Sequence, residues 1–294
     1  MPSIDVLDSS IHYEDSGSGA PIVFLHGNPS SSHAWRKILP AIGAPARLLA
    51  PDLIGMGRSG KPDIAYTFAD HARYLDAWFD ALDLRDVVLV GHDWGGALAF
   101  DLAARHPGRV RGIAFFETIV RPMSWNDLGE APRSRAETMR SPKGEELVLD
   151  QNFFIETAYT GGVLTPLTPD EMAPYLDPYP TRDSRRPILQ WARSLPLDGD
   201  PADVAERVAA YDTWLAASPD VPKLLLTFDS SPTLLITQET AAWCKDNIAG
   251  LRVEHIGPSG HHATEDQPEA IAAAITAWII ESTAVDPRAA GSAG

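Results

Sequence analysis

Short apolar runs alternate with longer stretches of helical periodicity along the chain. Five of these runs are bounded by turn residues and are expected to be buried strands: residues 21–25, 47–50, 87–90, 110–116 and 223–227. The helical patterns between the early runs cover residues 31–42, 68–82 and 95–105. Strands that are apolar at every position have both faces buried, which is typical of a mainly parallel sheet flanked by helices. Together with a more polar edge hairpin over residues 3–13, the pattern predicts an α/β fold.

The alternation stops after Phe116. From about residue 120 to residue 218 the chain is rich in Pro, Arg, Trp and Tyr, with helical stretches such as residues 143–159 and 202–215. A structureless loop of that length is rare in a compact protein. We therefore expect a helical cap over residues 120–218, inserted into a core of residues 1–119 and 219–282, and a disordered tail over residues 283–294.

The balance of charge narrows the expected partners. The 294 residues include 24 Lys and Arg against 40 Asp and Glu, which gives a net charge of −16. Nucleic acids and anionic membranes require clustered Lys and Arg, so neither is an expected partner. A strongly anionic substrate is disfavoured as well, unless a local basic pocket overrides the overall field.

The sequence carries no recognisable targeting or cofactor signal. Its longest apolar stretch, residues 270–280, is too short to cross a membrane and has the pattern of a last helix. The N-terminus lacks a signal-peptide pattern, and the single Cys244 excludes an internal disulfide. No phosphate-binding loop, zinc-ligand spacing or dinucleotide fingerprint occurs. We therefore expect a soluble, cytoplasmic monomer that needs no cofactor and no metal.

The strongest local signal is a reactive residue between a strand and a helix. Residues 87–97 read Val-Val-Leu-Val-Gly-His-Asp-Trp-Gly-Gly-Ala, with Asp93 at the turn. Small residues around one reactive residue permit the sharp turn called a nucleophile elbow. A carboxylate at a helix N-terminus is favoured in its ionised form, and it can attack a saturated carbon to form an ester. The alternative is that Asp93 only caps the helix. His92 is expected to point away from Asp93 and to be structural.

A second loop is expected to face the elbow. Residues 24–29 read Phe-Leu-His-Gly-Asn-Pro and follow a buried strand directly. The backbone N–H groups of Asn28 and Trp94 can form an oxyanion hole. Their side chains add two neutral donors, an amide and an indole, which are able to hold a leaving anion. The structural alternatives are that Asn28 serves only the turn before proline and that Trp94 belongs to the core.

The base and its acid each have two candidates. Residues 257–266, just before the last helix, contain His261 and His262 side by side, and this segment does not decide between them. Glu117 follows the strand after the elbow, and Asp229 follows the strand over residues 223–227. Asp52 lies after an earlier strand and is expected to order a Gly-rich turn.

Together these motifs resemble the haloalkane dehalogenases, a family with the α/β-hydrolase fold, from about residue 5 to residue 280. The resemblance rests on residues 26–29, Trp35, residues 52–57, residues 91–95, Glu117, residues 151–156, residues 185–191 and residues 257–266. It implies that His261 is the base, because the family's His precedes Glu-Asp by the same interval. It also implies that Glu117 is the acid and that Asn28 and Trp94 bind halide.

Two departures from the family pattern leave questions open. The loop over residues 227–233 ends in Pro-Thr, where the family has Pro-Gly, and its spacing predicts one additional residue. This keeps Asp229 open as a substitute acid. His262 stands where the family usually has an aromatic or bulky residue, so the pocket wall is expected to be more polar there.

The resemblance implies hydrolysis of a carbon–halogen bond in a small apolar substrate, with halide as a product. Asp93 would displace halide and form an alkyl ester, while Asn28 and Trp94 bind the halide. His261, oriented by Glu117, would then activate the water that cleaves the ester. Candidates for the apolar pocket wall are Trp125, Phe153, Phe154 and Trp191.

Three other functions compete with this interpretation. Epoxide hydrolases share the sequence Gly-His-Asp-Trp-Gly-Gly but need two cap tyrosines, for which Tyr159, Tyr175 and Tyr179 are available. The coelenterazine luciferases share nearly the same constellation, and residues 6–13 resemble theirs. A non-catalytic binding protein is disfavoured because nucleophile, base and acid are all present.

Overall fold

The computed structural model describes residues 2–229, 231 and 233–284. Its centre is an eight-stranded sheet with the order β1-β2-β4-β3-β5-β6-β7-β8. The first three strands in this order pair antiparallel, and all the others pair parallel. The bounds are β1 Ser3–Val6, β2 Ser9–Gly17, β3 Ala20–Leu25, β4 Ala46–Pro51, β5 Val87–His92, β6 Val110–Phe116, β7 Lys223–Phe228 and β8 Leu251–Gly257.

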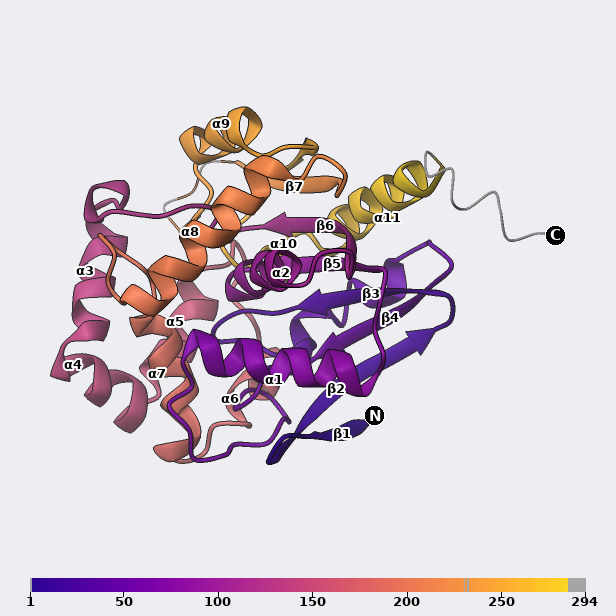
Figure 1. Ribbon diagram of the computed structural model, residues 1–294. Coiled ribbons are helices and arrows are strands. Elements are labelled where there is room, and N and C mark those ends of the chain that lie inside the picture. Colours follow the sequence, from indigo (N-terminus) through magenta and orange to yellow (C-terminus); the bar gives the residue numbers. More distant parts are fainter. Residues whose placement is uncertain (1, 230, 232, 285–294) are drawn as a thin grey trace.

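The five predicted strands and the edge hairpin are all confirmed. The strands are apolar at successive positions because both faces of the sheet are buried. Successive residues of β3 enter two different hydrophobic clusters: Val23 and Leu25 join one, and Ile22 and Phe24 join the other. Helices α1 (Phe68–Ala81) and α2 (Trp94–Arg105) cover the first face. The last helix, α11 (Pro268–Ala284), covers the second face. The sheet is therefore the middle of three layers (Figure 1).

The segment between β6 and β7 is helical, as expected. It contains α3 (Glu130–Arg140), α4 (Pro142–Glu145), α5 (Phe153–Gly161), α6 (Pro169–Leu176), α7 (Arg186–Arg193) and α8 (Ala202–Ala217). In Figure 1, α3, α4, α5 and α7 gather at one end of the sheet. Ile155 and Tyr159 of α5 belong to the same hydrophobic cluster as the α1 face of the sheet. The inserted helices therefore share a core with the sheet layer.

Two predicted helices are wrong in detail. Residues 31–42 form two short 3₁₀ turns, Ser32–Trp35 and Leu39–Ala41, where Pro40 has no N–H to donate. The stretch over residues 143–159 divides into α4, a π-helical turn at Glu146–Asp150 and α5. The break falls at Asn152, which has a left-handed φ of 55°. A local backbone conformation of this kind leaves no trace in hydrophobic periodicity.

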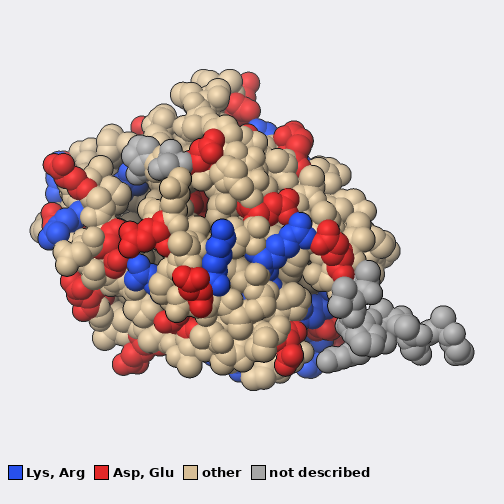
Figure 2. Space-filling view, turned by 90° about the horizontal axis from the view of Figure 1, so that it is seen from above, with Lys and Arg blue, Asp and Glu red and all other residues tan. Residues whose placement is uncertain are grey.

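The predicted last helix is present at the C-terminal side of the described chain. The last helix continues to Ala284, and the rest of the predicted tail lies outside the described residues. In the described part of the chain, no helix is long and apolar enough to span a membrane. Figure 2 shows acidic and basic side chains interspersed over one face of the molecule, so the excess of acidic residues does not form one continuous patch there.

Candidate active site

Asp93 occupies a sharp turn between β5 and α2. Its φ of 53° lies in a region that side-chain-bearing residues rarely adopt. The neighbouring backbone passes so close that a Cβ on Gly91 would lie 2.4 Å from the Cα of Gly96. A Cβ on Gly95 would lie 2.1 Å from the carbonyl oxygen of Leu25. The glycines of the Gly-His-Asp-Trp-Gly sequence are therefore required by close packing around a strained residue.

The Asp93 carboxylate is buried and bound by groups that favour its charge. The backbone N–H of Asn28 donates to Oδ1 at 2.9 Å, and Nε2 of His261 lies 3.5 Å from Oδ2. Burial opposes ionisation, but the hydrogen bond and charge of His261, with the Asn28 N–H, outweigh it and hold the pKa of Asp93 below its ordinary value. Asp93 is therefore an ionised carboxylate, as a nucleophile requires.

His261 joins Asp93 to a buried acid. Its Nδ1 lies 3.1 Å from Oε2 of Glu117, a residue that is 1% exposed and directly follows β6. The backbone N–H groups of Leu235 and Ile236 also donate to this carboxylate, at 2.8 and 3.2 Å. Burial lowers the pKa of His261, but the hydrogen bonds and charges of Asp93 and Glu117 outweigh it and raise the pKa to about 9. The three side chains thus form a carboxylate–imidazole–carboxylate chain, which is the geometry that a nucleophile, a base and its acid require.

The other candidates for the base and the acid, His262 and Asp229, make different contacts from those of His261 and Glu117. The ring of His262 stacks on Tyr159 with centroids 4.3 Å apart, and burial lowers its pKa well below the ordinary value. Asp229 pairs with the exposed His255 at 3.0 Å. His92, as expected, turns away from Asp93, and its Nε2 lies 2.8 Å from the carbonyl oxygen of His261. This geometry favours His261 and Glu117 over His262 and Asp229.

Asp52 orders the Gly-rich turn that follows it, as the sequence predicted. Its two carboxylate oxygens accept from the backbone N–H groups of Ser32 at 2.6 Å and Arg58 at 2.8 Å. These bonds hold the Gly-rich turn that follows β4 against the loop after β3. Asp52 is therefore structural.

A cavity of about 160 Å³ opens above Asp93. For comparison, a cavity of about 150 Å³ holds a molecule of the size of benzene. Residues at the carboxyl ends of the strands line one side: Asn28, Asp93, Trp94, Ile119 and His261. Residues of the inserted helices line the other: Arg135, Phe154, Ala158, Trp191 and Leu195. Two of the predicted wall residues, Phe154 and Trp191, are among them, whereas Trp125 and the half-exposed Phe153 are not.

Two residues with neutral N–H donors in their side chains, Asn28 and Trp94, line the same cavity as Asp93. One amide hydrogen of Asn28 is used in a bond from Nδ2 to the Ile188 carbonyl at 3.1 Å, which fixes the amide group. Among the described residues, the indole N–H of Trp94 has no hydrogen-bond acceptor. Both donors are therefore suited to an anion that leaves from a substrate held at Asp93.

Sequence reasoning missed the aromatic stack behind Trp94. The indole rings of Trp94 and Trp191 lie 4.6 Å apart, and the ring of His71 stacks on the far side of Trp191 at 4.2 Å. Burial lowers the pKa of His71 to about 3, so this ring is neutral. The three rings come from α2, α7 and α1, and no local signal in the sequence links them. The stack restricts the orientation of the Trp94 indole.

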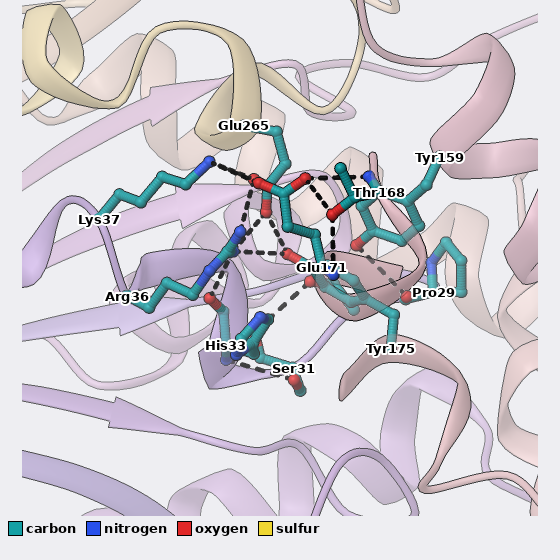
Figure 3. Close-up of polar contacts among 11 residues, drawn as sticks. Pro29, Ser31, His33, Arg36, Lys37, Tyr159, Thr168, Glu171, Tyr175 and Glu265 are labelled. Atoms are coloured by element: carbon teal, nitrogen blue, oxygen red, sulfur yellow. Dashed lines mark hydrogen bonds and ion pairs between the residues drawn. The ribbon is translucent and has the colours of Figure 1, made fainter. Parts of the chain in front are cut away.

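An ionic cluster ties the histidine loop to the inserted helices (Figure 3). Glu265 lies four residues after His261, and its side chain is 1% exposed. It accepts from Arg36 through both oxygens, at 2.5 and 2.8 Å, from Lys37 at 3.0 Å and from the Tyr175 hydroxyl at 2.5 Å. Burial opposes its charge, but Arg36, Tyr175 and Lys37 outweigh burial and lower its pKa. Tyr175 belongs to α6, so this carboxylate joins core and inserted segment.

Replacing Glu265 by glutamine is expected to lower the free energy of unfolding by about 2–3 kcal/mol, because two cations lose a buried anionic partner. Since the folded-state pKa of Glu265 lies below its ordinary 4.5, the contribution of the charge is present above about pH 4.5 and is lost at lower pH. Urea unfolding of both proteins at neutral and acidic pH measures this. Glu137→Gln, at an exposed pair with Arg133, is the control and should change stability by about 0.5 kcal/mol or less. Equal stability of wild type and Glu265→Gln at neutral pH would contradict the assignment.

The sheet, the strained elbow and the triad of side chains define an α/β hydrolase. The sequence matches the alpha/beta hydrolase fold family over residues 20–268. A haloalkane dehalogenase of Mesorhizobium japonicum is 46% identical, with 95% of this chain and 90% of that protein covered. One of Bradyrhizobium diazoefficiens is 44% identical, with 97% and 96% covered.

Solved structures agree with these sequence relatives. The haloalkane dehalogenase DbeA of Bradyrhizobium elkani superposes with a TM-score of 0.92 at 45% identity, covering 97% of this chain and 99% of that one. DatA of Agrobacterium tumefaciens superposes with a TM-score of 0.90 at 44% identity, covering 96% of each chain. This chain belongs to the haloalkane dehalogenase family.

Proposed function

We propose that this protein hydrolyses the carbon–halogen bond of small haloalkanes to give an alcohol, a halide ion and a proton. The observation that carries the proposal is an ionised carboxylate, Asp93, which contacts a histidine–glutamate pair in a cavity that is also lined by the N–H donors Asn28 and Trp94. The apolar part of the cavity wall suits a haloalkane, and the neutral donors suit the halide that leaves it.

In the first step, Asp93 attacks the carbon that bears the halogen. The new carboxylate–carbon bond forms as the carbon–halogen bond breaks, and the halide leaves with the bonding electrons. The Asn28 amide and the Trp94 indole donate hydrogen bonds to the halide. These donors carry no net charge. They therefore bind the neutral haloalkane weakly and stabilise the halide as its negative charge develops.

In the second step, His261 removes a proton from a water molecule that attacks the carbonyl carbon of the Asp93 ester. The bond from this carbon to the alkoxy oxygen then breaks, the alcohol leaves with a proton, and the Asp93 carboxylate is restored as the remaining proton is released. Esterification removes the negative charge of Asp93, and with it one of the main causes that raise the pKa of His261. His261 therefore becomes a base when the ester forms. Glu117 holds the ring by Nδ1 and stabilises the imidazolium. The backbone N–H groups of Asn28 and Trp94 face the developing oxyanion.

The inserted helices act as the cap of this site. We assign residues 120–218 to the cap and residues 1–119 and 219–282 to the hydrolase core, because the cavity lies where the two meet. A monomer that works in the cytoplasm, without cofactor or metal, stays a prediction from the sequence.

The position of the cap tyrosines argues against an epoxide hydrolase. The Tyr175 hydroxyl donates a hydrogen bond to Glu265, and the Tyr179 hydroxyl accepts one from the N–H of Gly57 at 3.2 Å. The Tyr159 hydroxyl lies 3.5 Å from the carbonyl oxygen of Pro29. None of the three is among the described residues that line the cavity. An epoxide ring at Asp93 therefore has no tyrosine to protonate it.

Incubation of the protein with 1-bromobutane and 1,2-dibromoethane tests the proposal, with bromide release as the readout. We expect many bromide ions per protein molecule, and no turnover of styrene oxide or light emission with coelenterazine. Turnover of styrene oxide with no bromide from any haloalkane would instead identify an epoxide hydrolase. Light emission alone would identify a luciferase-like oxygenase.

A further inference from the structure

Arg135 brings a positive charge to the rim of the active-site cavity. It lies on α3, is exposed to solvent and contributes to the cavity lining. Among the described residues that line the cavity, it is the only Arg or Lys, and Asp93 is the only carboxylate. The cavity thus has a reactive anion at its base and a cation at its opening.

In the described part of the chain, no carboxylate forms an ion pair with this guanidinium. Among the described arginines, Arg135 alone has no hydrogen bond, ion pair or ring contact. The helix sequence explains this, because its neighbours three and four positions away are uncharged: Ala131, Pro132, Thr138 and Met139. Arg133, two residues earlier on α3, has Glu137 at i+4 and pairs with it at 3.2 Å. A guanidinium with no partner is available to a ligand.

Apart from Asp93, the described residues that line the cavity carry no negative charge. Burial lowers the pKa of His262 most, and the charges of His261, His92 and Arg135 lower it further, so His262 is a neutral ring in the cavity wall. The lining also carries the hydroxyl groups of Thr157 and Thr233. Although the protein has a net charge of −16, Arg135 brings a positive charge directly to the cavity, and salt screens carboxylates that lie more than about 10 Å away.

We propose that Arg135 binds the carboxylate of substrates that carry a halogen at one end and a carboxylate at the other, such as 6-bromohexanoate. The inference rests on the proposed dehalogenase function and names a substrate class for it. Asp93 displaces bromide from the terminal carbon, and water then cleaves the ester. The products are 6-hydroxyhexanoate, bromide and a proton. The guanidinium matches a carboxylate in shape and charge and holds it at the rim while the halogen-bearing end reaches Asp93.

A binding experiment tests the site without relying on catalysis. Hexanoate and its neutral analogue hexanamide are titrated into the protein, and tryptophan fluorescence is followed, because Trp94 and Trp191 line the cavity. We expect hexanoate to bind about five- to tenfold more tightly, and a higher salt concentration to reduce this preference. Arg135→Gln should abolish the preference, and Arg135→Lys should restore part of it. Arg133→Gln is the matched control on the same helix and should retain it.

Turnover measurements link this site to the reaction. The ratio of kcat/KM for 6-bromohexanoate to kcat/KM for its methyl ester should fall about five- to tenfold in Arg135→Gln and stay constant in Arg133→Gln. Equal binding of hexanoate and hexanamide by the wild type, or an equal loss with both substrates in Arg135→Gln, overturns the inference. Wild-type protein that prefers hexanoate but releases no bromide from 1-bromohexane retains the anion site and refutes the proposed function.

Discussion

Replacement of Asp93 by alanine is expected to reduce bromide release from 1-bromobutane by about 10⁴-fold or more, to the level of the uncatalysed reaction. The carboxylate is the only described side chain in the cavity that can form the ester. Removing it leaves His261 and the halide donors in place but without a nucleophile. Bromide release by the purified variant and the wild type, compared at equal concentration, measures the loss.

The expected loss must not come from unfolding. Alanine carries a Cβ as aspartate does, so the backbone at a φ of 53° is similarly strained in both, and Asp93→Ala should fold with a circular dichroism spectrum like that of the wild type. Asp229→Ala is the control for the choice of carboxylate, because the one described side chain with which Asp229 pairs is the exposed His255. It should retain turnover. Bromide release that survives in Asp93→Ala and disappears in Asp229→Ala would reject the assigned site.

Replacement of His261 by phenylalanine is expected to stop the reaction after one bromide ion per protein molecule. Asp93 can still form the ester, because the halide donors Asn28 and Trp94 are unchanged. The ester then persists, since among the described side chains none other than His261 lies in contact with Asp93 in a position to activate water. Mass spectrometry of the intact protein should find one butyl group added after incubation with 1-bromobutane.

The neighbouring histidine supplies the control for this experiment. The His262 ring stacks on Tyr159 and makes no hydrogen bond with Asp93 or Glu117 among the described residues. His262→Phe should therefore release many bromide ions per molecule and accumulate no adduct. If the adduct formed in His262→Phe and not in His261→Phe, the base would be His262.

The apolar pattern predicted the strands well because each one is buried on both faces. Residues 110–116 were expected as a strand, and β6 has these bounds. The helix expected over residues 31–42 is wrong because periodicity does not register the missing N–H of Pro40. The left-handed Asn152 divides a second predicted helix in the same way. A pattern that extends over many residues therefore predicts an element reliably, whereas a break that depends on the backbone conformation of one residue is not predicted.

The sequence by itself determined the elements of the site that depend on local order along the chain. A strand, a glycine-bounded Asp93 and a helix must form the elbow, because only small neighbours permit that turn. The order of the motifs also predicted the α/β hydrolase fold and its inserted helices.

Only the tertiary structure decided which distant groups meet. The family resemblance already implied Glu117 rather than Asp229 and His261 rather than His262, and the side-chain directions at the ends of three strands support this choice. The Trp94–Trp191–His71 stack joins three helices, and the position of Arg135 at the cavity rim, with no partner among the described residues, depends on which residues surround it. Spacing along a chain does not encode such contacts, because they arise when packing brings residues far apart in sequence within bonding distance.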